Sequence, residues 1–198
     1  MTVTNTQARY GAVAMTLHWL IALLIIGNLC SGFLLAHILG DDHPWKFDLI
    51  QIHKSMGLTV LMLSLLRLVW RLANSIPLLP PGMSLPLRIA ARGTHYLFYF
   101  LIIAIPLAGW AWASSSPRGI PTYYFWLFQW PNIPFLADEP HAMKVANSQM
   151  YHSYHAYLAY SAAILLLLHI GAALYHHLFR GDEVLKRMWP GTQIEAGR

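Results

Sequence analysis

Histidines in this sequence interrupt segments that are otherwise apolar. The chain has 11 histidines in 198 residues. Segment 151–177, YHSYHAYLAYSAAILLLLHIGAALYHH, holds five of them, and almost every residue between His155 and His169 is apolar. An ionisable side chain inside an apolar segment of membrane length is costly, so it usually faces the interior of the protein and has a function there.

Four of the histidines form two pairs by their depth in the apolar segments. His18 and His169 lie toward one end of their segments, and His53 and His155 lie toward the other end. His155 and His169 are separated by 14 positions, which in a helix is about 21 Å of rise and about 40° of rotation. One helix would therefore present an imidazole at each of two depths on nearly the same face.

Paired imidazoles from facing helices are the axial ligands of a six-coordinate haem b. The sequence has no Cys-x-x-Cys-His motif, which excludes covalently attached c-type haem, and its single cysteine excludes an internal disulfide. Zinc usually takes three or four neighbouring ligands, whereas these histidines come in separate twos. Any one of them alone could be a hydrogen-bonded contact between helices. The pairing at two depths favours two haem b groups, with the ligand pairs His18/His169 and His53/His155.

Four long apolar segments must position these side chains. They cover residues 13–36, 49–71, 94–113 and 151–179. Each is near or above the ~20 residues that cross the hydrocarbon core as a helix. Charged residues make up 11% of the chain, against about 25% in a soluble domain. The sequence therefore predicts an all-α fold: an integral membrane four-helix bundle in a single domain, 1–198, with an outer loop at 114–149.

The lysines and arginines predict how this bundle lies in the membrane. Nine of the 13 fall near the two termini and the connection 72–93, and four fall on the other side. Because cytoplasmic loops carry an excess of Lys and Arg, both termini are expected in the cytoplasm. The net charge of +5 does not indicate nucleic-acid binding, since the basic residues are scattered and form no stripe.

The connections differ in composition. Residues 76–86, IPLLPPGMSLP, predict an irregular cytoplasmic loop. Residues 123–130, YYFWLFQW, are too short to span the membrane and are expected to lie at its interface. Small residues near the histidines, Gly32, Gly57 and Gly171, would make room for a macrocycle or serve plain helix packing.

Four stretches resemble the bacterial cytochrome b561 family: TLHWLIALLII with His18, IQIHKSMGLTVLMLSLLRLVWRL with His53, YHAYLAYSAAILLLLHIGAALYHHLF with His155 and His169, and DEVLKRMWPG. This family is related to the cytochrome b subunits of nickel–iron hydrogenase and formate dehydrogenase. The resemblance implies a multi-pass protein of the bacterial inner membrane that binds two haem b groups and exchanges electrons with ubiquinone. It places His18 and His169 at the cytoplasmic-side haem and His53 and His155 at the outer one.

A second group of residues lies on the expected cytoplasmic side, and the resemblance implies a quinone site or proton path there. The group comprises His95, His176, Arg88 and Arg92. The alternative is that they pair with haem propionates or lipid headgroups at the interface.

Several functions stay open at this point. The chain would be an electron carrier between the two faces of the membrane, an anchor for a partner dehydrogenase or other redox protein, or a histidine-lined transporter of protons or metal. One branch of the resembling family is a superoxide oxidase, which oxidises superoxide at the outer face and reduces ubiquinone. That activity calls for a positive outer surface, and here acidic residues such as Asp41 and Asp42 crowd the same side as Lys46.

Overall fold

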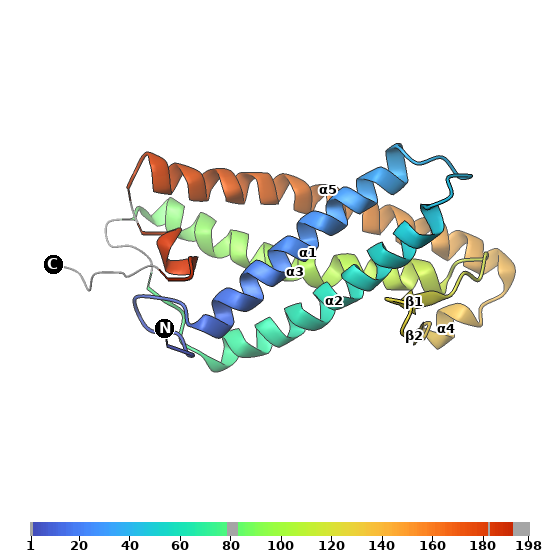
Figure 1. Cartoon of the computed structure of the whole chain (residues 1–198), viewed down its shortest axis with the longest axis horizontal. Helices are drawn as coiled ribbons and strands as arrows, with labels where there is room; N and C mark the ends of the chain where they lie inside the picture. Colours follow the sequence, from blue (N-terminus) through green and yellow to red (C-terminus); the bar gives the residue numbers. More distant parts are fainter. Residues whose placement is uncertain (1, 79–82, 182, 192–198) are drawn as a thin grey trace.

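The computed structural model describes residues 2–78, 83–181 and 183–191, and four long helices dominate it (Figure 1). They are α1 (Ala12–His37), α2 (Lys46–Ala73), α3 (Leu85–Ser114) and α5 (His141–Leu178). All four are long and apolar enough to cross a membrane. Helix α1 packs on α2, α2 on α3, and α3 on α5. The predicted all-α membrane four-helix bundle is confirmed.

The chain ends and the connection after α2 gather at one end of the bundle, called here the terminal end (residues 2–11, 74–78 and 183–191) (Figure 1). The Asn5 side chain donates to the Ser75 carbonyl at 2.9 Å. The Trp19 indole N–H donates to the Met188 carbonyl at 2.8 Å. Residues 38–45 and 115–140 lie at the opposite end, called the hairpin end.

Two helices begin well before the apolar segments that predicted them. Helix α3 begins at Leu85 rather than at 94, and α5 begins at His141 rather than at 151. Hydropathy detects only the part of a helix that crosses hydrocarbon, so polar extensions are missed. A proline lies in the first turn of α3, where a missing N–H costs no hydrogen bond. The irregular stretch at 76–86 is therefore shorter than expected, and its residues 79–82 lie outside the described residues.

The expected outer loop contains a β-hairpin and a short helix. Strand β1 (Thr122–Tyr124) pairs antiparallel with β2 (Phe128–Trp130), and α4 (Pro134–Ala137) follows. The turn between the strands places Phe125 at φ 46° and Trp126 at φ 59°. Two successive residues with positive φ form a type I′ turn, which normally favours Asn-Gly. The aromatic sequence therefore gave no sign of the hairpin.

Large apolar side chains cover the outside of the bundle, while small polar groups lie inside it. Leu23 is 67% exposed and Leu167 is 72% exposed. Such a surface needs lipid around it, because helices satisfy their own backbone hydrogen bonds and can present apolar side chains to hydrocarbon. In contrast, Gln51, Ser55 and Ser64 on α2 are fully buried. The interior of this bundle thus holds polar groups beside buried apolar side chains such as Met15 and Leu101.

Candidate functional site

The four histidines meet in two pairs, one toward each end of the bundle. The ring centres of His18 on α1 and His169 on α5 are 6.4 Å apart, with the rings at 71°. The ring centres of His53 on α2 and His155 on α5 are 6.0 Å apart, with the rings at 78°. The structure therefore brings together the same partners that depth in the sequence indicated.

The spacing within each pair fits two ligands on opposite sides of one metal. A metal–imidazole bond is about 2 Å long and the ring centre lies about 1 Å beyond the nitrogen, so opposed ring centres are about 6 Å apart. Within the described residues, no group of three or more His, Cys, Asp or Glu side chains gathers as a metal site. A metal held by two imidazoles takes its other ligands from elsewhere, and a porphyrin supplies four.

Hydrogen bonds orient both rings of the hairpin-end pair. Nδ1 of His155 donates to the Ile105 carbonyl at 2.9 Å. Nδ1 of His53 lies 2.9 Å from Oγ of Ser31, whose hydroxyl donates to the Asn28 carbonyl at 3.0 Å and so accepts from the ring. A metal-binding histidine typically gives its other N–H to such an acceptor, which leaves Nε2 free as a ligand. Ser31 was missed in the sequence; its signal was a polar residue within an apolar helix.

Glycines make room for this pair. A Cβ on Gly109 of α3 would lie 3.0 Å from Nδ1 of His155, and one on Gly32 of α1 would lie 3.1 Å from Cε1 of His53. Both approaches are tighter than side-chain packing normally tolerates. The sequence singled out Gly32 but not Gly109. Gly171, which it also singled out, has nothing within 4 Å of its Cβ position.

The terminal-end pair lies among cationic side chains. Nη1 of Arg67 donates to Nδ1 of His18 at 3.0 Å; a guanidinium has only donors, so the ring nitrogen must accept. The Phe98 ring packs edge-on against His169, with ring centres 5.2 Å apart. The Arg71 guanidinium lies 5.3 Å from the centre of the Tyr99 ring. This pair therefore lies in a more positive environment than the pair at the hairpin end.

Of the predicted second group, His95 comes closest to the histidine pairs. It is half-buried on α3, one turn before Phe98, whose ring packs against His169. Arg88 and Arg92 precede it at the i, i+4, i+7 spacing of a single helix face. Both arginines are exposed.

His176 and the next residue, His177, point to different sides of α5, and His177 is exposed. His176 is half-buried, and its ring centre is 6.1 Å from that of Tyr175. It follows His169 by two turns of α5 toward the terminal end. All four residues of the predicted second group therefore lie in the terminal-end half of the bundle.

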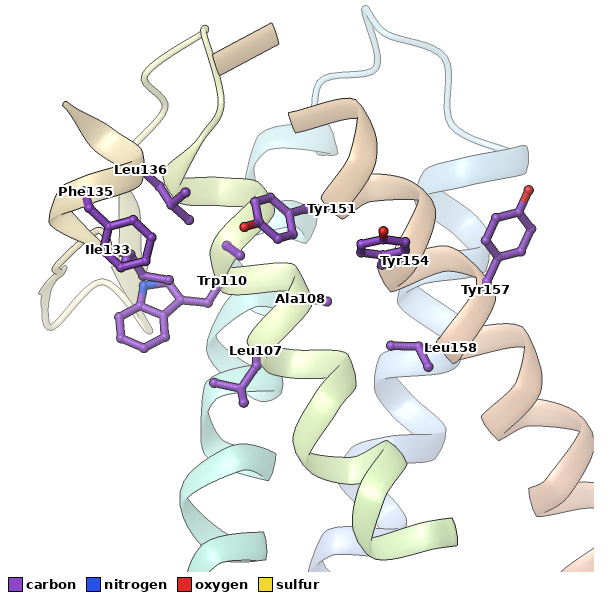
Figure 2. Close-up of a pocket in the computed structure, with 11 residues that line it drawn as sticks. Leu107, Ala108, Trp110, Ile133, Phe135, Leu136, Tyr151, Tyr154, Tyr157 and Leu158 are labelled. Carbon is purple, nitrogen blue, oxygen red and sulfur yellow. The ribbon is translucent and has the colours of Figure 1, made fainter. Parts of the chain in front are cut away.

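A groove of about 500 Å³ lies apart from both histidine pairs (Figure 2). Side chains of α3, α4 and α5 line it, including Ala108, Leu136 and Tyr154. Its lining is almost entirely apolar, and none of the four paired histidines contributes to it. The groove is therefore an apolar seam between helices, and the four paired histidines lie outside its lining.

Comparison with known proteins agrees with this geometry. The profile of the family described as prokaryotic cytochrome b561 matches residues 9–191. The chain is 31% identical to cytochrome b561 homolog 2 of Escherichia coli (strain K12) over the full length of both chains. It is 30% identical to the probable superoxide oxidase CybB of Yersinia pestis, over 92% of this chain and 96% of that protein. With four spanning helices and histidines paired at ligation distance, this chain belongs to the prokaryotic cytochrome b561 family, whose members are multi-pass, haem b-binding electron-transfer proteins of the bacterial inner membrane.

Proposed function

We propose that the chain holds two haem b groups, one between His18 and His169 and one between His53 and His155, and passes single electrons between the two faces of the membrane. The observation that carries this proposal is the spacing of the pairs, at 6.4 and 6.0 Å between ring centres. When bound, haem supplies one-electron redox chemistry, and ligation by two histidines leaves no open position on the iron.

The helices set the route between the two proposed sites. His155 and His169 are 14 residues apart on the continuous helix α5, which separates them by about 21 Å along its axis. The terminal end holds the larger share of the lysines and arginines, so both termini are proposed to lie in the cytoplasm. The hairpin end then faces outward.

We propose that ubiquinone exchanges electrons at the terminal end. Quinone chemistry takes up or releases a proton with each electron, and imidazole is the side chain that titrates near neutral pH. His95 lies one turn before Phe98, which packs against His169 of the terminal-end pair, and His176 lies two turns beyond His169. Arg88 and Arg92 add positive charge on the face of α3 that carries His95.

A second candidate is superoxide oxidation at the hairpin end, which the name of the Yersinia pestis relative favours. The surface there is not simply positive, because Nζ of Lys46 forms a salt bridge with Asp41 at 2.6 Å. A third candidate function is that of an anchor for a dehydrogenase or other redox partner. It uses the same two haems with a different electron donor.

The test uses purified protein in lipid vesicles with ubiquinol as the reductant, and the haem b absorbance as the readout. Wild type and His53→Ala should both be reduced by ubiquinol, whereas His169→Ala should keep its hairpin-end haem and lose rapid reduction. Purified wild type without a haem b spectrum would overturn the electron-carrier function and favour a transporter. Loss of ubiquinol reduction in His53→Ala alone would move the quinone site to the hairpin end.

The choice of electron donor needs its own comparison. Superoxide added to the same vesicles should reduce the haems and then ubiquinone if the chain is a superoxide oxidase. Reduction that needs a co-purifying dehydrogenase would instead indicate the anchor role.

A further inference from the structure

The β-hairpin does not lie on top of the bundle; it runs down beside α2. Gln51 Nε2 donates to the Pro121 carbonyl at 3.0 Å, and its Oε1 accepts from the Tyr123 N–H at 2.8 Å. One helical turn further, Oγ of Ser55 accepts from the Phe125 N–H at 2.9 Å. The hairpin therefore follows α2 from its outer end toward the middle of the bundle, as Figure 1 shows.

These contacts place the turn between the two strands more than two helical turns along α2 from its first residue, Lys46. Ser55 is the tenth residue of α2, which begins at Lys46, so it lies about 14 Å along the helix from that end. The Tyr124 hydroxyl reaches Thr59 at 3.0 Å, a further turn along. Helix α2 is long and apolar enough to cross a membrane, and its uncharged apolar stretch begins at Met56, directly after Lys54 and Ser55, so that Thr59 lies inside it. The turn therefore lies where the apolar stretch of α2 begins, at the outer boundary of the hydrocarbon core, and the Tyr124 side chain reaches inside that boundary.

Non-helical backbone survives at this depth only when protein groups satisfy its hydrogen bonds. Gln51 and Ser55 are fully buried and do this for the inner edge of β1. The single proton of the Ser55 hydroxyl is shared between the Gln51 carbonyl at 2.7 Å and the Tyr123 carbonyl at 3.0 Å. Buried polar side chains on an apolar helix are costly unless paired, and the hairpin is what pairs them.

The tip of the hairpin points its side chains away from the protein. Four successive large apolar residues are exposed there: Phe125 at 38%, Trp126 at 51%, Leu127 at 77% and Phe128 at 50%. Such a run would be an exposed patch in water. At the depth of Ser55 its neighbours are lipid chains, which suit these side chains.

We propose that residues 122–130 form a re-entrant hairpin whose tip, residues 125–128, inserts between the acyl chains of the outer leaflet. Its polar edge is held by Gln51 and Ser55, and its apolar edge contacts lipid. This goes beyond the proposed electron transfer and does not depend on it. The occupant of the surface is phospholipid; a protein partner bound from the aqueous side would require the tip to be reachable from water.

The test places a nitroxide spin label at position 127 in the full chain, in lipid nanodiscs with haem loaded. Cys30, the single native cysteine, is first replaced by serine. Leu127→Cys is compared with Asp42→Cys, in the exposed loop before α2, and with Leu167→Cys, on the exposed apolar surface of α5. Collision rates with dissolved oxygen and with a water-soluble nickel chelate report lipid and water exposure respectively.

The label at 127 should behave like the one at 167: a several-fold loss of collisions with the nickel chelate relative to position 42, and a gain with oxygen. Phe128→Cys serves as a second tip position and should give the same result. Collision rates at both tip positions equal to those at position 42 would overturn the proposal, and would indicate an aqueous surface open to a protein partner. An unchanged haem b spectrum confirms that each labelled protein is folded.

Discussion

The two histidine pairs share one spacing but differ in what orients their rings. At the hairpin end, the Ile105 carbonyl and the Ser31 hydroxyl accept from Nδ1 of His155 and of His53. At the terminal end, Arg67 donates to Nδ1 of His18. Because the proton of each of these two rings is on Nδ1, where a neutral acceptor holds it, Nε2 is unprotonated and can bind a metal. The Arg67 contact instead leaves the proton of neutral His18 on Nε2, so ligation there requires that proton to leave Nε2.

The difference also has an electrostatic consequence. A nearby cation stabilises whichever state of a redox group carries the additional electron. Arg67 contacts the terminal-end pair, and Arg71 lies one turn further along α2. We therefore expect the terminal-end haem to have the higher reduction potential, which favours electron flow from the hairpin end to the terminal end. Quinone at the terminal end would then exchange electrons with the haem of higher potential.

The largest effect is expected from filling the space beside one pair. Gly109→Val adds a branched side chain where even a Cβ lies 3.0 Å from His155, so the ring should be displaced and the hairpin-end haem lost. The matched control is Gly171→Val, because nothing lies within 4 Å of that Cβ position. Haem per chain, measured on purified protein, should fall by half in the first variant only. Full haem content in Gly109→Val would show that this approach does not constrain the ligand.

A smaller effect is expected from removing the cation of the terminal-end pair. Arg67→Gln should lower the potential of that haem, because a unit charge about 8 Å away at an effective dielectric constant of 20 contributes about 2 kcal/mol, or about 90 mV. The potential of the other haem should stay constant. Redox titration of the haem absorbance measures both, with Arg118→Gln at the hairpin end as the control. Equal shifts of both potentials would contradict a difference between the two ends.

Loss of a hairpin anchor should reduce stability at the hairpin end. Ser55→Ala leaves the Phe125 N–H without its partner, and an unsatisfied buried group costs about 1–3 kcal/mol. Thermal melting followed by haem absorbance should therefore begin at a lower temperature. Ser153→Ala is the control, since that hydroxyl bonds only within its own helix at an exposed position. Identical melting of the two variants would mean that Ser55 does not hold the hairpin.

The smallest effect concerns the salt bridge at the hairpin end. The hydrogen bond and charge of Lys46 lower the pKa of Asp41 below its ordinary value of 3.8. A lowered folded-state pKa means that the stabilisation is complete above the ordinary value and is lost as the pH falls through the lower one. A carboxyl titration by NMR should show the pKa of Asp41 rising in Lys46→Gln. High salt should reduce the difference, because the carboxylate is fully exposed, and an unchanged pKa would exclude the interaction.

The fold was largely predictable because hydropathy alone identifies membrane-spanning helices. The early starts of α3 and α5 were not, since charged residues such as Arg88, Arg92 and Lys144 interrupt the hydropathy of their first turns. The hairpin was not predictable either. Its turn places Phe125 and Trp126 in a conformation that favours Asn and Gly, and its partners Gln51 and Ser55 are about 70 residues away in sequence.

The candidate site was predictable in its members and not in its surroundings. Helical periodicity and depth are local properties, so they indicated which histidines could face each other. Which atom orients each ring depends on how helices approach. The Ile105 carbonyl is 50 residues from His155, and Gly109 matters only because α3 packs against α5. Backbone carbonyls and glycines carry no side-chain signal that would mark them in the sequence.

The most direct test of the two-haem proposal is haem quantitation with a reduced-minus-oxidised spectrum on wild type, His53→Ala and His169→Ala. Wild type should hold two haem b per chain, and each variant should hold one. The remaining haem of His53→Ala should have the higher potential, because it lies at the terminal end beside Arg67. A variant that keeps both haems, or a wild type with a single haem, would contradict the assignment of one haem to each pair.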